Sequence, residues 1–584
     1  MIRIGGASGF WGDSSVAVPQ LVRRAEVDYI SFDYLAELTM SILTAARAKD
    51  PAAGWAKDFV EVALAGMLPE IAARNIRLLT NAGGINPHAC AAALATAARD
   101  AGVALRIAVV DGDDVRDRVP AAAGMPRTLL SANAYLGAFP IAAALARGAH
   151  VVITGRCVDS ALPLGALIYE FGWLPGDWDK LAAGSLAGHL LECGAQATGG
   201  LFTDWERVER WDDIGYPIAE CEADGTFTIT KAPGTGGLVE PAVVAEQMLY
   251  EIGDPAAYVL PDVVCDFTQV TMEADGADRV LVKGARGRPA TGTYKVSATY
   301  LAGFRCVGTL TIIGIDAARK ARRTAEAILA RTRAIFAERG LADYRATNIE
   351  AIGAEETYGP HARTAATREV TMRLCVDHPD RRALEIFARE IAPAGTSWSP
   401  GTTGAGAGRP KPSPLVKFAS FLLPKAEVTV AVEMDGERTP VSIAIPATVT
   451  QAEVASTDAH PPAQSTIAAA SGATAQVPLV ELAYARSGDK GDSSNIGVIA
   501  RRPEFVAVLR KQLTPERVAA YFAHLVRGRV RRYELPGIGA FNFTLEEALG
   551  GGGMASMRID PLGKGFAQML LDLPVEIDAA LLNY

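Results

Sequence analysis

The sequence predicts an α/β protein: an N-terminal, mostly parallel sheet with helices on both faces, then an α+β middle region and a small C-terminal α+β domain. Over residues 1–170, short β-branched or apolar runs alternate with longer helix-forming segments, and the runs end in polar or glycine-rich turns. Such alternation is typical of parallel strands connected by helices. The chain of 584 residues also exceeds what one hydrophobic core usually covers, so two or three domains are expected.

The candidate site lies where the predicted parallel strands end. Strands are expected over residues 2–4, 29–32, 76–80 and 151–154. Because the carboxyl ends of parallel strands meet at one edge of a sheet, where the following helices offer free backbone N–H groups, the turn residues should surround one crevice. These residues are Asp13, Asp33, Glu37, Asn81, Asn86, Arg156 and Asp159. Taken one at a time, each is explained equally well as an ordinary turn or cap residue.

The segments between these strands have helical composition or spacing. Helices are expected over residues 35–48, 55–73, 87–101, 132–147 and 161–171, with a further strand over 105–110. The first turn, Gly5–Gly9, does not keep the Gly-x-Gly-x-x-Gly spacing of a dinucleotide site. We therefore predict no nucleotide cofactor.

The alternation loosens beyond residue 174, where two polar segments are candidates. His189 and Glu192 lie on one face of a predicted helix, together with Cys193 and Gln196. His189 alone fits a helix-surface or satisfied core histidine, but these polar neighbours favour a functional role. The glycine-rich turn at 231–237, with Thr235 and Gly236, can point backbone N–H groups at a carbonyl or phosphate oxygen, although such loops are common.

The second half of the chain reads as α+β followed by a separate domain. It contains predicted strands at 294–300, 310–314, 428–432 and 441–445, a helix at 316–339 and a glycine-rich loop at 396–409. Residues 451–476 are rich in Ala, Ser, Thr, Gln and Pro and lack apolar periodicity, which predicts a linker. Residues 477–584 then suffice for one compact domain with a small split βαβ sheet.

The segment Arg486–Asn495 is the most polar turn of the chain and is expected between two strands. It is not a P-loop, because the Gly-x-x-x-x-Gly-Lys-Ser/Thr spacing is absent. A solvated hairpin tip is one explanation, and contact with an acidic ligand or the large domain through Asp489 and Lys490 is the other. We expect the domain to dock against the large domain or a neighbouring subunit and to support the site; an independent tethered module is the alternative.

Composition and charge restrict the class of protein. A content of 49% hydrophobic and 21% charged residues fits a soluble globular protein, and a net charge of −9 disfavours nucleic-acid or anionic-membrane partners. No run of about 18 uncharged apolar residues occurs, and the chain enters a strand directly instead of a signal peptide, so a cytoplasmic location is expected. The seven cysteines include no Cys-x-x-Cys pair, which indicates reduced thiols and no metal site.

Five motifs together resemble one known family. They are the segments 4–13, Asp33–Glu37, Thr80–Pro87, Thr154–Asp159 and Ala485–Ile496. Over nearly its whole length the chain is similar to the acyclic terpene utilisation A family, whose large N-terminal domain corresponds to 1–450 here, as one unit or as 1–170 plus 171–450. Its C-terminal ferredoxin-like domain corresponds to 477–584. The resemblance implies a role in the breakdown of monoterpenes such as citronellol and geraniol through coenzyme A thioesters, and it supplies no catalytic residues.

The residue types at the predicted crevice suit acid–base chemistry at a polarised carbonyl. One carboxylate would move a proton while Arg, Asn or backbone N–H groups hold an enolate or oxyanion. The catalytic candidates are Asp33, Glu37, Arg156, Asp159 and His189, and the substrate-binding candidates are Gly6, Ser8, Asp13, Asn81, Asn86, Glu192, Thr235 and Gly236. A serine nucleophile is disfavoured because the Gly-x-Ser-x-Gly elbow is absent.

Two hypotheses from different classes follow. The first is a homo-oligomeric enzyme that hydrates, isomerises or hydrolyses an isoprenoid acyl-CoA-type substrate without a cofactor. The second is a non-catalytic acyl-CoA-binding or complex-assembly subunit. The gathering of ionisable residues at strand ends favours the first, because a pure binder would need fewer of them.

Overall fold

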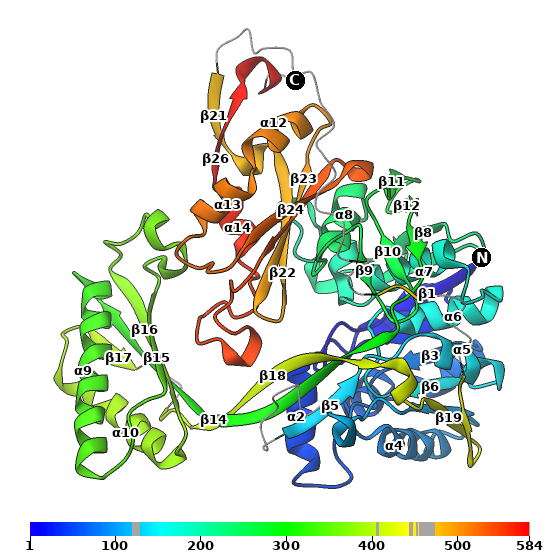
Figure 1. The fold of residues 1–584 in the computed structure, drawn as a ribbon, viewed down its shortest axis with the longest axis horizontal. Helices are drawn as coiled ribbons and strands as arrows, with labels where there is room; N and C mark the ends of the chain where they lie inside the picture. The colour runs from blue at the N-terminus through cyan, green and yellow to red at the C-terminus, as the bar shows by residue number, and fades with distance from the viewer. Residues whose placement is uncertain (120–128, 405–407, 443–447, 451–453, 455–473, 583–584) are drawn as a thin grey trace.

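The computed structural model describes residues 1–119, 129–404, 408–442, 448–450, 454 and 474–582. Figure 1 shows three parts: a large α/β part that contains the N-terminus, a lobe built around α9 (Ala317–Glu338) and α10 (Arg381–Ser397), and a C-terminal domain that lies between and above them. The two long strands β14 (Thr293–Ile313) and β18 (Ser413–Pro424) run side by side from the α/β part into the lobe (Figure 1). Among the described residues, no helix is long and apolar enough to cross a bilayer.

The large sheet has five parallel strands at its centre. In spatial order these are β1 (Ile2–Gly6), β2 (Tyr29–Phe32), β3 (Arg77–Thr80), β6 (Val151–Thr154) and β4 (Ile107–Asp111). Antiparallel strands extend both edges: β7 (Pro217–Cys221), β8 (Phe227–Lys231), β12 (Val280–Lys283) and β11 (Thr271–Ala274) beyond β1, and β19 (Ala431–Met434) and β20 (Glu437–Pro440) beyond β4. The α/β class is confirmed, but the sheet is more mixed than predicted because segments after residue 170 complete it.

Helices cover both faces of this sheet. One face packs against α1 (Ala17–Arg24), α3 (Leu68–Ala73) and α4 (Pro87–Asp100), and the other against α5 (Phe139–Ala146), α6 (Ala161–Phe171) and α7 (Trp178–Leu191). Alternate strand residues serve the two cores, as Ile30 and Phe32 on one face and Tyr29 on the other show. Where the sequence predicts one helix over 55–73, a short π-helical turn at Phe59–Ala63 precedes α3.

The middle of the chain is organised by one 21-residue strand, β14 (Thr293–Ile313). Its first half pairs with β5 (Leu129–Ala134) and β18 (Ser413–Pro424), and its second half with β16 (Glu369–His378) and β17 (Thr402–Gly404). In the lobe, β15 (Ala346–Ile352) pairs with β16, and α9 (Ala317–Glu338) and α10 (Arg381–Ser397) pack on the sheet.

Three predictions for this region are corrected by β14 and its partners. The two separate strands predicted at 294–300 and 310–314 are one strand, since the polar and glycine-containing stretch between them still pairs with β16 and β18. Residues 132–134, predicted to begin a helix, belong to β5, because β14 supplies a pairing edge that local sequence does not reveal. The predicted loop at 396–409 contains the end of α10 and β17, with 405–407 outside the described residues.

Further short elements among the described residues up to 450 are α2 (Glu37–Arg47), α8 (Pro241–Leu249), and a small sheet of β13 (Arg286–Arg288), β10 (Val264–Asp266) and β9 (Tyr258–Val259). The late strand predicted at 441–445 falls mostly outside the described residues, whereas the one predicted at 428–432 overlaps β19.

The C-terminal domain has a four-stranded antiparallel sheet in the order β22 (Ala483–Lys490), β23 (Ser493–Ala500), β25 (Ala540–Leu545) and β24 (Val530–Leu535). Its helices are α12 (Phe505–Gln512), α13 (Pro515–Tyr521) and α14 (Phe566–Leu571), and a ribbon of β21 (Thr474–Pro478) and β26 (Pro574–Asp578) adds two strands. Thus 474–476 of the predicted linker are in a strand, and 451–453 and 455–473 lie outside the described residues. Arg486–Asn495 forms a β-hairpin between β22 and β23, and the turn is shorter than predicted, because only Gly491 and Asp492 lie between the two strands.

The C-terminal domain docks on the segment that follows α8. Asn495 donates to the Leu249 carbonyl (2.6 Å) and accepts from the Glu251 backbone N–H (3.0 Å). Asn542 donates to the Gly253 carbonyl at 2.6 Å. An ideal Cβ on Gly497 would lie 2.4 Å from the Leu249 Cβ, so β23 packs against α8 as closely as a glycine permits.

Candidate functional site

Asp33 and Asn81 follow adjacent strands and form the centre of the candidate site. The Asn81 side-chain amide donates to Asp33 Oδ1 at 2.5 Å, and its oxygen accepts from the Tyr34 backbone N–H at 2.8 Å, which fixes the orientation of the amide. Both side chains are buried. Burial raises the pKa of Asp33 well above its usual range, the Asp159 carboxylate raises it further, and Arg156 opposes the rise. Asp33 can therefore exchange a proton at a higher pH than a solvated carboxyl group.

Arg156 follows β6, next to β3 in the sheet, and is held rigidly. One Nη donates to the Cys157 carbonyl (2.7 Å) and to Asp159 Oδ1 (2.6 Å), and the guanidinium carbon lies 4.1 Å from the centroid of the Tyr135 ring. Its buried Nε has no hydrogen-bond partner within the part of the chain that the structure describes. An unpaired buried donor is costly, so an acceptor that reached this N–H would gain a hydrogen bond that the protein itself does not supply.

Glu37, at the start of α2, joins the same group of charges through two residues that the sequence did not indicate. The Tyr135 hydroxyl donates to Glu37 Oε1 at 2.7 Å, and Lys295 Nζ on β14 lies 3.7 Å from the same oxygen. Burial tends to raise the pKa of Glu37, but the charges of Lys295 and Arg156 outweigh it and lower the pKa to about 2. Glu37 therefore stays ionised and serves to hold charge, instead of moving protons near neutral pH.

His189 and Glu192 form a buried pair at the end of α7. His189 Nδ1 lies 2.9 Å from Glu192 Oε1, and Nε2 lies 3.1 and 3.2 Å from the carbonyl oxygens of Gln247 and Met248. Since carbonyls only accept, Nε2 carries a proton. Burial lowers the pKa of His189, and the Glu192 carboxylate more than offsets this. Both ring nitrogens are thus engaged, which favours a positioning role for His189 over the predicted catalytic one.

The hairpin of the C-terminal domain brings Asp489 and Lys490 close to these charged residues of the large domain. Lys564 Nζ lies 3.4 Å from Asp489 Oδ1 and 3.0 Å from Glu251 Oε1, so it ties the hairpin to the large domain. Lys490 Nζ lies 4.9 Å from the centroid of the Tyr258 ring. Lys490 interacts electrostatically with carboxylates of the large domain, although its own side chain stays exposed to solvent.

We call seven of these residues the charged cluster, because each interacts electrostatically with other members of the set. They are Asp33, Glu37, Arg156, Asp159, Glu192, Lys295 and Lys490. Asp159 and Lys295 keep 33% and 38% of their side-chain surface in contact with solvent, whereas Asp33 and Arg156 are buried. Solvent exposure therefore differs within the charged cluster, from the buried Asp33 carboxyl group to the partly exposed Lys295.

Ser8, Asp13 and Asn86, predicted to bind substrate, make hydrogen bonds that hold local backbone. Ser8 Oγ donates to the Asp33 carbonyl at 2.9 Å. Asp13 accepts from the backbone N–H groups of residues 9 and 14 and from the Tyr216 hydroxyl. Asn86 donates to the carbonyls of residues 51 and 53. These contacts shape the turns beside the charged cluster.

The glycine-rich turns are corrected more directly. An ideal Cβ on Gly6 would lie 2.3 Å from the Leu191 carbonyl oxygen, so protein backbone fills the space that a ligand was expected to take. At Gly236 the corresponding Cβ would lie 2.3 Å from the Arg210 carbonyl oxygen, and Thr235 Oγ1 donates to the Ala232 carbonyl at 2.6 Å. Both turns need glycine for close packing of chain segments.

Asp113 is a further buried carboxyl group that the sequence analysis did not select, although it follows β4 as the selected residues follow their own strands. Its Oδ2 accepts from Asn133 Nδ2 (2.7 Å) and from the Arg156 backbone N–H (2.8 Å). Burial raises its pKa to about 7, and both hydrogen bonds oppose the rise. It supports the backbone from which Arg156 projects.

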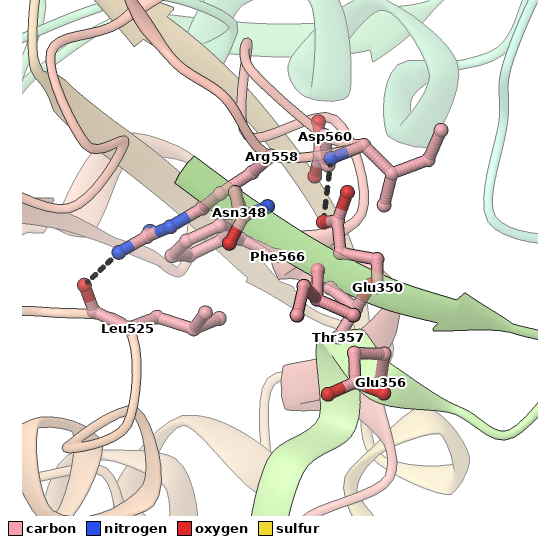
Figure 2. A pocket seen from close by; sticks show the side chains of 10 residues that line it. Asn348, Glu350, Glu356, Thr357, Leu525, Arg558, Asp560 and Phe566 are labelled. Atoms are coloured by element: carbon pink, nitrogen blue, oxygen red, sulfur yellow. Dashed lines mark hydrogen bonds between the residues drawn. The ribbon is translucent and has the colours of Figure 1, made fainter. Parts of the chain in front are cut away.

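A separate pocket of about 140 Å³ lies between the lobe and the C-terminal domain. Glu350 accepts from the Ile559 backbone N–H (2.8 Å), and Arg558 donates to the Leu525 carbonyl (3.1 Å). Figure 2 shows Glu350, Arg558 and Leu525 lining this pocket. Arg373 also pairs with Glu350 at 2.5 Å. The pocket is smaller than the roughly 300 Å³ at which sites for drug-sized ligands begin, and these charged groups already have partners, so we assign it to domain packing.

One group of side chains among the described residues has the spacing of metal ligands. His88 lies 3.8 Å from Asp111 and 3.9 Å from Glu433. Arg438 already pairs with Asp111 at 2.9 Å, and a bound cation would have to compete with that guanidinium. We therefore assign the group to surface ion pairing.

Family models account for most of the chain. The model described as acyclic terpene utilisation family protein AtuA matches residues 2–434, which run from β1 to the end of β19. The chain belongs to this family. The model of the AtuA ferredoxin-like domain matches residues 477–576, which include the whole four-stranded sheet. No curated protein and no solved structure matches the chain.

The family matches confirm the resemblance drawn from the five motifs and give the chain a role in acyclic terpene utilisation. Residues of the charged cluster lie in both matched regions: Asp33 and Arg156 within residues 2–434, and Lys490 within residues 477–576.

Proposed function

We propose that this protein is an enzyme of acyclic terpene breakdown that carries out acid–base chemistry at the carbonyl end of an isoprenoid acyl thioester. The observation that carries the proposal is the buried Asp33 carboxyl group, oriented by Asn81 and placed beside a guanidinium with an unpaired N–H. A carboxyl group with a raised pKa next to a donor for an oxyanion is the combination that proton transfer beside a carbonyl requires.

In the proposed reaction, Asp33 takes a proton from the substrate carbon (isomerisation) or from the attacking water (hydration or hydrolysis), and later gives that proton to the product or to the leaving thiolate. Negative charge then develops on the acyl oxygen, and Arg156 stabilises it through its free N–H. Asn81 and the Leu35 backbone N–H both donate to Asp33 Oδ1, which leaves Oδ2 to exchange the proton. Hydration, isomerisation and hydrolysis of the thioester all use such a step.

A second candidate function is a non-catalytic acyl-CoA-binding or complex-assembly subunit. One observation favours it: Arg156 pairs with Asp159, and Glu37 with Tyr135 and Lys295, so part of the charged cluster neutralises itself as a structural network does. A binder of this kind would retain the ligand and release it unchanged.

The test is the turnover of geranyl-CoA by the full chain and by Asp33→Asn. Asparagine keeps an oxygen to accept the two hydrogen bonds at Oδ1, so the fold should persist. We expect turnover to fall by about 10²- to 10⁴-fold, the usual contribution of a general acid or base, with geranyl-CoA affinity unchanged. Asp50→Asn, at an exposed position, is the control. Full activity in Asp33→Asn would refute the role of Asp33, and tight binding without turnover by the wild type would establish the second function.

A further inference from the structure

Lys490 is a cation of the charged cluster with unused hydrogen-bonding capacity. Its Nζ lies 3.5 Å from the Glu251 carbonyl oxygen and stacks over the Tyr258 ring. Among the described residues, no carboxylate lies within 4.0 Å of it. An ammonium group has three donors, so at least one remains for a ligand.

The neighbouring cations differ from Lys490 in this respect. Arg156 pairs with Asp159 at 2.6 Å, Lys295 lies 3.7 Å from Glu37, and Lys564 bridges Glu251 and Asp489. These three neutralise carboxylates of the protein. Lys490 lies among the same carboxylates without pairing closely to any one of them.

The backbone that carries Lys490 is fixed on both sides. Asn495, on the opposite strand of the hairpin, bonds to the large domain at two backbone groups. Asp492, in the turn, accepts from the backbone N–H groups of Leu549 (3.2 Å) and Gly551 (2.6 Å). An ideal Cβ on Gly552 would lie 1.9 Å from the Gly491 carbonyl oxygen, so the glycine-rich segment 550–553 packs directly against the hairpin tip. Only side-chain freedom remains to be lost when Lys490 binds a ligand.

We propose that Lys490 binds the acyl oxygen of the substrate, so that the C-terminal domain completes the site of the large domain. The proposal rests on the proposed function, because it places the reacting end of the substrate at the charged cluster. Asp159 interacts with Lys490 and also pairs with the Arg156 guanidinium beside Asp33. A negatively charged acyl oxygen between the two cations is stabilised from both domains.

The electrostatic surroundings keep Lys490 protonated for this task. The protein atoms around Lys490 lower its pKa even though the side chain is exposed, but Tyr258, Glu251, Asp159 and Glu37 raise the pKa by a larger amount. His189 and Lys295 also interact electrostatically with Lys490.

The experiment measures binding of three probes to the full chain: geranyl-CoA, free geranate and coenzyme A alone. Loss of one charge-assisted hydrogen bond should weaken geranyl-CoA and geranate about ten- to a hundredfold in Lys490→Met, and Lys490→Arg should recover most of the affinity. Coenzyme A alone should bind equally to wild type and Lys490→Met. A stronger effect on geranate than on geranyl-CoA would identify a carboxylate as the bound form, and the reverse a thioester.

Lys564→Met removes the same charge nearby and is the matched control. It breaks the anchor to Glu251 and Asp489, so we expect a lower melting temperature and less than a threefold change in geranyl-CoA affinity. Equal losses in Lys490→Met and Lys564→Met would overturn the proposal, as would a loss of affinity for coenzyme A alone. Asp33→Asn should leave geranyl-CoA binding intact, so a failure of the proposed catalytic function and a failure of Lys490 binding give different results.

Discussion

Asp113→Asn should stabilise the α/β part relative to the wild type at neutral pH. At acid pH the substitution should change the stability much less. In the wild type both hydrogen bonds to this carboxyl group end on Oδ2, from Asn133 and from the Arg156 backbone. An asparagine can present its carbonyl oxygen at that position and keep both bonds. The substitution therefore removes the ionisation of the group and leaves its contacts in place.

The magnitude follows from the raised pKa of Asp113. Burial lifts it from 3.8 to about 7 in the folded protein. Between pH values of about 4 and 7 the folded state holds the proton and the unfolded state does not, so the stability contributed by this group falls as the pH rises through that window. Three pKa units correspond to about 4 kcal/mol. The asparagine side chain does not titrate in either state, so the variant should gain about 4 kcal/mol relative to the wild type across the window.

Urea unfolding followed by tryptophan fluorescence at half-unit steps from pH 4 to pH 8 measures this difference. Subtracting the wild-type curve cancels the other buried carboxyl groups, since Glu192 and Asp489 also have raised pKa values. Asp114→Asn, on the neighbouring exposed side chain, controls for the loss of one negative charge. A wild-type-to-Asp113→Asn difference that stays constant from pH 4 to pH 8 would refute the argument, because it would mean that Asp113 is ionised in the folded state.

Two further substitutions test the packing that positions the site. Gly6→Ala places a Cβ 2.3 Å from the Leu191 carbonyl oxygen and should lower the unfolding free energy by about 1–3 kcal/mol through overpacking. The control Gly292→Ala has open space around its Cβ and should lower it by less than about 1 kcal/mol. Equal urea midpoints for the two variants would contradict this expectation. Arg305→Met leaves the buried Asp377 carboxylate unpaired and removes three hydrogen bonds to carbonyls of the C-terminal domain. We expect the unfolding free energy to fall by about 3–5 kcal/mol, and calorimetry to show a separate melting transition of that domain at lower temperature. A single unchanged transition would show that the docking does not depend on this contact.

The part of the site that sequence could predict is the part that lies at the ends of parallel strands. Asp33, Asn81 and Arg156 were selected because short buried strands precede them, and the sheet order β2-β3-β6 puts those strand ends next to one another. Parallel pairing fixes the direction of each strand, so every carboxyl end faces the same edge. No knowledge of the loops was needed for this step.

The residues that sequence missed reach the site through pairing partners distant in the chain. Lys295 is on β14, and it lies beside Tyr135 because the Tyr135 backbone N–H donates to the Lys295 carbonyl (2.9 Å) immediately after β5 ends. Residues 132–134 have helical composition, and pairing with β14 overrides that preference. Local sequence therefore gave the wrong element at the point where Tyr135 enters the site.

The glycine-rich turns show why a correct motif can lead to a wrong role. Gly6 was expected to admit a ligand oxygen, since a glycine allows close approach of any group to the backbone. The group that approaches is the Leu191 carbonyl at the end of α7, and the next residue, Glu192, belongs to the charged cluster. The absence of a side chain at Gly6 thus lets the helix end come close enough to bring Glu192 within electrostatic reach of Asp33.

The hairpin of the C-terminal domain combines both kinds of inference. Its charge was visible in the sequence, and docking was expected because Asp489 and Lys490 offer both signs. The different roles of Lys490 and Lys564 could not be predicted from the sequence, because each lysine contacts a residue far away in the chain. Lys490 contacts the Glu251 carbonyl, 239 positions earlier, and Lys564 contacts the Glu251 carboxylate, 313 positions earlier. The side chain paired with carboxylates anchors the domain, and the one without such a partner is free to bind substrate. Charge in a sequence therefore indicates an interface, but only the three-dimensional pairing shows which charge is left for a ligand.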